Sequence, residues 1–216
     1  MFDALLNFLF PPRCPNCSSY VERRGGFCHA CARRLIGVRV LARTPETARQ
    51  LAGIWTLGHY REGVRDLLRA LKYQQKKSAL PHLHAMLAEG EEVLAQLPRP
   101  LTAVAVPLGR ARQKARGFNQ TEEIFASWLR AHDIALLPLL VRTRETAPLY
   151  EHMRAERQRE LRGAFAVTEA MDVSGQDILL LDDIMTTGAT LTECARTLKR
   201  AGARNVYAVA LTSEHL

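Results

Sequence analysis

The stretch that decides the fold is ILLLDDIMTTGAT, residues 178–190. Its four consecutive apolar residues, 178–181, predict a strand that is buried on both faces, as strands of a parallel sheet are. Two adjacent acids, Asp182 and Asp183, follow this strand. Open parallel sheets bind their ligands at the carboxyl ends of their strands, so we expect a ligand site here.

The turn after the acids has the chemistry of a phosphate site. Gly188 permits a tight turn, and hydroxyls and backbone N–H groups at a helix start can surround an anion. The groups expected to do so belong to Thr186, Thr187, Gly188, Ala189 and Thr190. The carboxylates repel phosphate, so they should contact hydroxyls or a cation. A phosphorylated ribose such as ribose 5-phosphate combines both groups. The stretch resembles the signature with which type I phosphoribosyltransferases bind 5-phosphoribosyl-1-pyrophosphate (PRPP), and this resemblance implies PRPP as the ligand.

The rest of the chain from residue 53 alternates apolar segments with amphipathic ones, which predicts an α/β fold with a mainly parallel sheet. We expect strands at 54–60, 103–106, 135–141, 164–167, 178–181 and 206–211, although Pro138 weakens the third. Helices are expected at 61–72, 80–97, 120–131 and 190–201. The pattern predicts an α/β domain over 53–216, which the signature resemblance implies is a phosphoribosyltransferase domain, together with a linker over 38–52 and a separate unit over 1–37.

The N-terminal unit contains four of the five cysteines. Cys14 and Cys17 form one Cys-x-x-Cys pair, and Cys28 and Cys31 form another. Two such pairs are typical of a tetrahedral structural zinc site, with His29 as an alternative ligand. Five arginines surround the pairs, at positions 13, 23, 24, 33 and 34. They either face water or contact the phosphates of a nucleic acid.

A second anion site is expected on PLGRARQKARGFN, residues 107–119, which follows the strand at 103–106 and contains no acid. Its cations are Arg110, Arg112, Lys114 and Arg116. We interpret it as a basic loop that holds pyrophosphate, and we select Arg110, Lys114 and Arg116 as the binding residues. Magnesium usually sits on substrate phosphates with few protein ligands, so Mg²⁺ should accompany PRPP without a protein cage. The polar segment 142–162 is interpreted as a lid, in which His152, Arg154 and Arg157 are candidates for contacting the leaving group.

Composition sets wider limits. The net charge is +8 and the sequence pI is near 9.6, which favours phosphorylated partners or nucleic acid. No apolar run reaches the roughly 18 residues of a membrane span, so we expect no membrane insertion. The apolar start, MFDALLNFLFPP, lacks the basic region of a signal peptide, so we expect a cytoplasmic protein.

Several motifs together resemble the ComF family (competence protein FC and its relatives). They are LFPPRCPNC at 9–17, HYREGVRDLLRALKY at 59–73, RGFNQ at 116–120, and RTRET and LRGAF at 142–146 and 161–165. The resemblance implies a type I phosphoribosyltransferase fold behind an N-terminal zinc finger. It also implies that Asp182 and Asp183 contact the ribose hydroxyls, that the Thr186–Thr190 turn holds the 5-phosphate, and that Lys72 belongs to the site.

Two functions follow from these expectations. In the first, the protein is a Mg²⁺- and PRPP-dependent phosphoribosyltransferase with an unidentified acceptor, and Asp182 and Asp183 are its catalytic acids. It is not a glutaminase, because the chain begins Met1-Phe2 and not with a cysteine nucleophile. In the second, it is a non-catalytic PRPP or nucleotide sensor. The resemblance implies a role in DNA uptake and natural transformation, with single-stranded DNA and a DNA-translocating helicase as possible partners.

Overall fold

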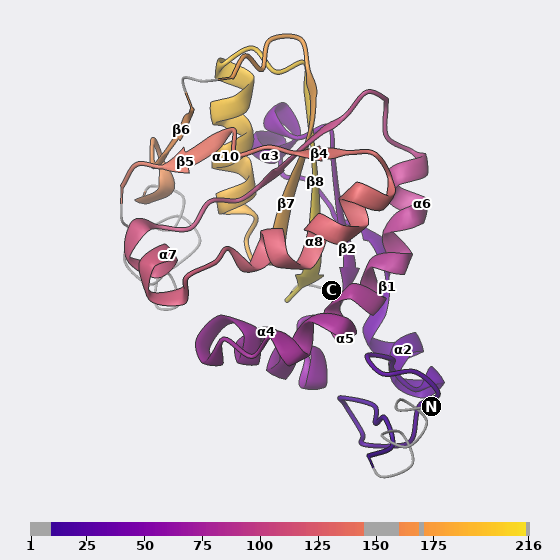
Figure 1. Ribbon diagram of the computed structural model, residues 1–216. Coiled ribbons are helices and arrows are strands. Elements are labelled where there is room, and N and C mark those ends of the chain that lie inside the picture. Colours follow the sequence, from indigo (N-terminus) through magenta and orange to yellow (C-terminus); the bar gives the residue numbers. More distant parts are fainter. Residues whose placement is uncertain (1–9, 145–159, 169–170, 215–216) are drawn as a thin grey trace.

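A six-stranded sheet forms the centre of the protein (Figure 1). The structure is a computed structural model that describes residues 10–144, 160–168 and 171–214. Its strand order is β1-β2-β8-β7-β3-β4, and every neighbouring pair is parallel except β1 with β2. The strands are β1 (Ile36–Val40), β2 (Gly53–Gly58), β3 (Thr102–Ala105), β4 (Ala135–Leu136), β7 (Asp177–Met185) and β8 (Asn205–Ser213). The expected mainly parallel α/β sheet is therefore confirmed.

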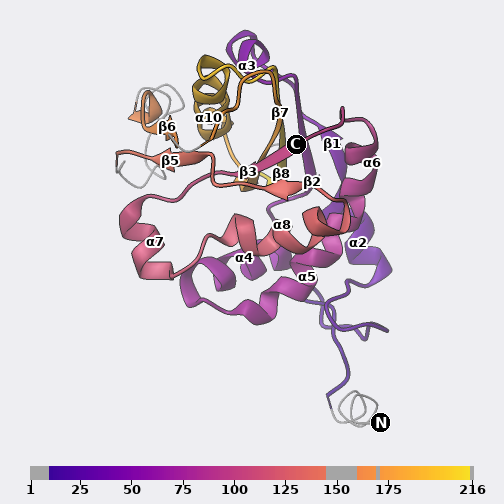
Figure 2. The ribbon, with the colours of Figure 1, turned by 45° about the horizontal axis from the view of Figure 1, so that its top comes forward.

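Helices cover both faces of the sheet (Figures 1 and 2). One face packs against α4 (Glu62–Gln74), α5 (Leu80–Ala85), α6 (Gly90–Ala95) and α8 (Gln120–Ala131), and the other against α3 (Pro45–Gln50) and α10 (Ala189–Arg200). Strand β7 alternates between the two cores, because side chains point to opposite faces along a strand. Leu179 and Leu181 belong to the first core, and Ile178 and Leu180 to the second.

Three expected elements differ from the structure. The helix expected at 80–97 is broken into α5, a 3₁₀ turn (Met86–Glu89) and α6. At this break the ring of Trp128 packs on the backbone of Gly90, where a Cβ would lie only 2.5 Å away. The strand expected at 135–141 is divided around Pro138 into β4 and β5 (Leu140–Arg142). The basic loop contains a short helix, α7 (Arg110–Arg116).

The segment interpreted as a linker is built into the fold. Residues 36–40 form the antiparallel edge strand β1, and α3 follows with the Thr44 hydroxyl accepting from the N–H of Thr47. Leu51 is fully buried in the core beside α10. Residues 38–52 are therefore packed on the sheet, through the pairing of β1 with β2 and through the buried side chain of Leu51, and do not form a free linker.

Strand β5 pairs with β6 (Phe165–Val167) in a separate two-stranded sheet beside α7 and α10 (Figure 1). The tip of the expected lid, including His152, Arg154 and Arg157, lies outside the described residues. Within the described ranges, no helix is both long enough and apolar enough to cross a membrane.

Candidate functional site

Asp183 and Lys72 meet at the carboxyl end of the sheet. The Lys72 ammonium lies 2.7 Å from Oδ2 of Asp183, and the two side chains are 13% and 4% exposed. Lys72 reaches this position from the last turn of α4, whose buried Val64, Leu68 and Leu71 hold the helix against the sheet. The lysine thus places a positive charge directly beside the acids of the DD pair.

The sequence predicted that the two acids follow the strand. In the structure they lie within it, because β7 continues to Met185. The neighbouring strand β8 is as long as β7, and it pairs Ala210 with Asp182 and Ser213 with Met185. The two carboxyls stay close together, because Asp182 interacts with the side chain of Asp183 and with the charge of Lys72. Asp183 turns toward α4, and Asp182 lies near Cys194 of α10, whose thiol pKa is raised by burial and then by the charge of Asp182.

The carboxyl of Asp182 has a raised pKa. Burial raises the pKa of its carboxyl well above the usual value, the charge of Asp183 raises it further, and Lys72 opposes both effects. Its Oδ1 accepts a hydrogen bond of 2.9 Å from the backbone N–H of Asp183. The raised pKa favours the protonated form, and a protonated carboxyl can donate a hydrogen bond to a ligand hydroxyl as well as accept one.

The turn that follows the acids has the geometry of an anion site. Gly188 has a φ of +73°, a left-handed conformation that favours glycine, and it caps the twelve-residue helix α10. The N–H of Ala189 points to the Thr187 hydroxyl at 3.4 Å, and Thr186, Thr187 and Gly188 line a groove of about 460 Å³. The start of α10, where first-turn N–H groups lack partners within the helix, therefore borders an accessible hollow.

Helix α7 divides the four cations of the basic segment into two pairs, because residues four apart lie on the same side of a helix. Arg112 and Arg116 line a cavity of about 410 Å³ that also contains Lys72. Arg110 and Lys114 line a different cavity of about 900 Å³ on the other side. The expectation that Arg110, Lys114 and Arg116 act together is thus not met in the structure, which brings Lys72 together with Arg112 and Arg116.

The four N-terminal cysteines converge on one point. Their sulfur atoms all lie within 4.8 Å of one another, and those of Cys17 and Cys28 are 3.6 Å apart. Four sulfurs bound to zinc at about 2.3 Å in a tetrahedron are about 3.8 Å apart, so this set fits zinc. A backbone hydrogen bond at Cys31 lowers the pKa of the Cys28 thiol to about 6, whereas burial raises that of Cys31 to about 12.

Asn16 connects this cysteine cluster to helix α4. Its Nδ2 donates to the sulfur of Cys31 at 3.3 Å, and its Oδ1 accepts from the N–H of Gly63 at 2.9 Å. A Cβ on Gly63 would lie 2.7 Å from the carbonyl oxygen of Pro15, so only glycine allows this approach. Cys14 and Cys31 are buried in the same core as α4 and α5, so the N-terminal unit is docked on the sheet domain.

Known proteins match both parts of the chain. A double zinc ribbon domain matches residues 5–40, and a phosphoribosyl transferase domain matches residues 133–215. Competence protein F of Haemophilus influenzae is 26% identical over 90% of this chain and 82% of that protein. DNA utilization protein YhgH of Salmonella typhi is 30% identical over 206 residues, which span 89% of this chain and 86% of that protein. The chain belongs to the ComF family.

For this ComF-family chain, the type I phosphoribosyltransferase fold behind a Cys₄ zinc ribbon is confirmed. Among solved structures, the adenine phosphoribosyltransferase of Thermoanaerobacter pseudethanolicus has a TM-score of 0.38 and 14% identity over 65% of this chain and 83% of that one. That likeness is too weak to carry an argument of its own.

Two residues that the structure places at these candidate sites were not selected from the sequence. Arg112 was treated only as one of several basic residues of the loop. If the segment had been predicted as a helix, the spacing of four residues would have placed Arg112 and Arg116 on the same face. Asn16 gave no signal of its own, because both of its partners, Cys31 and Gly63, are distant in sequence.

Proposed function

We propose that the carboxyl end of the sheet binds PRPP together with Mg²⁺. The observation that carries this proposal is the buried pair of Lys72 and Asp183, set directly before a threonine- and glycine-rich turn at a helix start. The match of residues 133–215 to a phosphoribosyl transferase domain supports it.

Each part of the site has a distinct task in this proposal. The first turn of α10 takes the 5-phosphate through the hydroxyls and N–H groups of Thr186–Thr190. Asp182 and Asp183 hold the two ribose hydroxyls as hydrogen-bond acceptors. Lys72, Arg112 and Arg116 surround the pyrophosphate. Magnesium would be held mainly by the oxygens of PRPP, with Asp182 and Asp183 as the acidic groups of the chain that could support it, and would neutralise the charge of the leaving group.

We propose phosphoribosyl transfer as the reaction. The bond from C1 of the ribose to the pyrophosphate oxygen breaks, that oxygen keeps the electron pair, and a nucleophile of the acceptor bonds to C1. The chain contributes charge and orientation: the cations stabilise the departing pyrophosphate, and the carboxylates fix the ribose while positive charge develops at C1. Asp182 and Asp183 are therefore the residues on which turnover depends most.

A second function, in DNA handling, has its own support. The relatives are named for competence and DNA utilization, and Arg13, Arg23 and Arg33 on the zinc ribbon are exposed, as is Tyr20 at 66%. Arginines can bind phosphates and an exposed aromatic ring can stack on a base. We propose that the ribbon contacts single-stranded DNA in the cytoplasm during DNA uptake, next to a DNA-translocating helicase.

Two measurements separate a phosphoribosyltransferase from a PRPP sensor that does not catalyse transfer. PRPP with Mg²⁺ should raise the melting temperature of the zinc-loaded protein, and Asp183→Asn should remove that shift. Pyrophosphate release from PRPP in the presence of candidate acceptors then reports transfer. A thermal shift without any pyrophosphate release would favour a sensor, and the absence of a shift at saturating PRPP and Mg²⁺ would contradict both versions.

A further inference from the structure

The ion pair between Lys72 and Asp183 is incomplete on the side of the acid. Oδ2 of Asp183 is buried, and among the described residues it has no hydrogen-bond donor. The Lys72 ammonium lies 2.7 Å from this oxygen, but not in a direction that makes a hydrogen bond. A buried carboxylate oxygen without a hydrogen bond is costly, so Asp183 is compensated here by charge alone. This oxygen can therefore accept a different cation.

A single ammonium faces two carboxyl groups at this place. The pKa of Asp182 is raised by burial and by the charge of Asp183, and the charge of Lys72 lowers it only in part. One positive charge thus serves two acids that lie next to each other in β7. A divalent cation carries the second charge, and Mg²⁺ prefers carboxylate oxygens as ligands. The acids fit such an ion better than they fit the lysine.

The Lys72 ammonium has a second place to which it can move. Lys72 lines the cavity of about 410 Å³ together with Arg112 and Arg116. The amide of Gln75 donates to the carbonyl of Ala115 at 3.2 Å and so holds the end of α4 beside α7. A lysine has a flexible stem, so its ammonium can move while both helices stay fixed.

The charges around the cavity decide which place the ammonium takes. The guanidinium groups of Arg112 and Arg116 repel it while no anion is bound there, and Asp183 attracts it. A pyrophosphate in the cavity would reverse this balance, because its negative charges attract all three cations. The position of Lys72 therefore depends on whether an anion lies between α4 and α7.

We propose that Lys72 is a built-in counter-ion, which stands in for a divalent metal beside Asp182 and Asp183 in the free protein and moves to the pyrophosphate when PRPP binds. The two carboxyls then exchange the ammonium for Mg²⁺, so they face a cation in both states. This inference deepens the proposed PRPP function and rests on it. It assigns Lys72 the task of admitting the metal only together with the ligand.

Cooperative binding follows from this exchange. In the free protein a metal ion has to displace Lys72 toward two arginines, so metal binding is suppressed. When PRPP attracts the lysine, that obstacle disappears. By linkage, PRPP and the metal should each strengthen the binding of the other by the same factor. Replacement of Lys72 by a neutral residue should release the metal site from this control.

Binding of Mn²⁺ without PRPP tests the exchange. Mn²⁺ takes the same oxygen ligands as Mg²⁺, does not compete with zinc for the cysteines, and is counted as free ion by electron paramagnetic resonance. We expect full-length zinc-loaded wild type to bind Mn²⁺ weakly, and Lys72→Met to bind it at least roughly tenfold more tightly, because methionine removes the competing charge. Mn²⁺ should also raise the melting temperature of Lys72→Met more than that of wild type.

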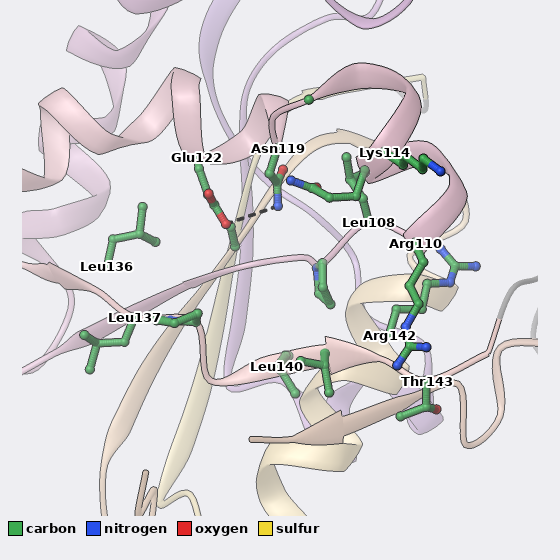
Figure 3. Close-up of a pocket in the computed structure, with 16 residues that line it drawn as sticks. Leu108, Arg110, Lys114, Asn119, Glu122, Leu136, Leu137, Leu140, Arg142 and Thr143 are labelled. Carbon is green, nitrogen blue, oxygen red and sulfur yellow. Dashed lines mark hydrogen bonds between the residues drawn. The ribbon is translucent and has the colours of Figure 1, made fainter. Parts of the chain in front are cut away.

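Three variants provide the controls. Lys114→Met removes the same ammonium from α7 at the border of the larger cavity, which Figure 3 shows, and should leave Mn²⁺ binding unchanged. Lys72→Arg keeps the charge and should bind Mn²⁺ as weakly as wild type. Lys72→Met combined with Asp183→Asn should lose the gain. If Lys72→Met does not fold, Lys72→Gln, whose amide can donate to Asp183, takes its place.

The outcomes separate this inference from the proposed function, since the metal titration contains no PRPP. If PRPP binds, it should raise the Mn²⁺ affinity of wild type more than that of Lys72→Met. A gain of Mn²⁺ binding by Lys72→Met without any PRPP binding would contradict the proposed function and support the counter-ion. The inference is overturned if Lys72→Met binds Mn²⁺ no more tightly than wild type, or if Lys114→Met gains as much.

Discussion

Lys72 and Asp183 join two distant parts of the chain through an ion pair of 2.7 Å that is almost completely shielded from water. Lys72 belongs to α4, the helix on which the zinc ribbon is docked, and Asp183 belongs to β7, the strand before the phosphate turn. The pair therefore links the N-terminal unit to the proposed ligand site, and several predictions about stability and binding depend on it.

Replacement of Lys72 by methionine should destabilise the protein by about 3 kcal/mol, because it leaves the Asp183 carboxylate buried without its partner. The free energy of unfolding in urea measures this loss. Lys76→Met, at an exposed position after the same helix, should change it by less than about 0.5 kcal/mol. Addition of Asp183→Asn to Lys72→Met should recover part of the lost stability. Equal stability of Lys72→Met and wild type would show that the pair does not hold α4 in place.

Asn16 should control both the retention of zinc and the docking of the ribbon. Asn16→Ala removes the N–H that donates to Cys31 and the oxygen that accepts from Gly63, so zinc release to a chelator should be faster and unfolding easier by about 1–3 kcal/mol. Asn16→Asp keeps the acceptor but not the donor. It should release zinc faster and retain more of the stability. If both variants hold zinc as tightly as wild type, Asn16 has no role at the metal.

Removal of zinc should destabilise the whole protein. Cys14 and Cys31 are buried in the same core as Leu68 and Leu83, so loss of the ribbon exposes the α4 and α5 side of the sheet domain. We expect a strong chelator to lower the midpoint of one cooperative thermal transition, and added zinc to restore it. A melting curve that resolves a zinc-dependent step and an unchanged later step would indicate two independent units.

His59 should make stability depend on pH. His59 is buried directly after β2, and its Nδ1 lies 2.9 Å from Nη1 of Arg39. Burial, and then the charges of Arg39 and Arg61, lower the pKa of His59 from 6.5 to about 4. Between these values the unfolded chain binds a proton that the folded protein does not, so stability falls as the pH falls from 6.5 to 4. The loss reaches about 3 kcal/mol at most.

Unfolding of wild type and His59→Gln at several pH values checks this dependence. Above pH 6.5 the free energies of unfolding of the two proteins should change with pH in the same way. Below pH 6.5 only wild type should lose the stability that comes from the neutral His59. A variant whose stability falls as steeply as that of wild type between pH 6.5 and pH 4 would assign the dependence to other groups.

The sheet and its order along the chain could be predicted because their signals are local. The apolar run 178–181 and the amphipathic pattern over 120–131 have strong periodicity, and α8 has the expected bounds. The spacing of the cysteines is equally direct, since it specifies a metal site without tertiary information. The match to a double zinc ribbon domain confirms the structural zinc.

Helix α7 was missed because none of its seven residues is buried, so no apolar periodicity marks it. The signal that existed was the glycine on each side, and Gly117 has the left-handed φ of +79° that ends many helices. Because this helix was not predicted, Arg110 and Lys114 were placed in the same group as Arg116, although the two sets line different cavities. The edge strand β1 was missed for a related reason, since its partner β2 is separated from it by α3.

The affinity of the protein for PRPP, measured by calorimetric titration in the presence of Mg²⁺, tests the central claim most directly. Wild type should bind with one site per chain, Asp183→Asn and Arg112→Ala should weaken binding by at least roughly tenfold, and Lys114→Ala should bind as wild type does. Absence of PRPP binding to the folded, zinc-loaded wild type, or equal binding by Asp183→Asn, would contradict the account.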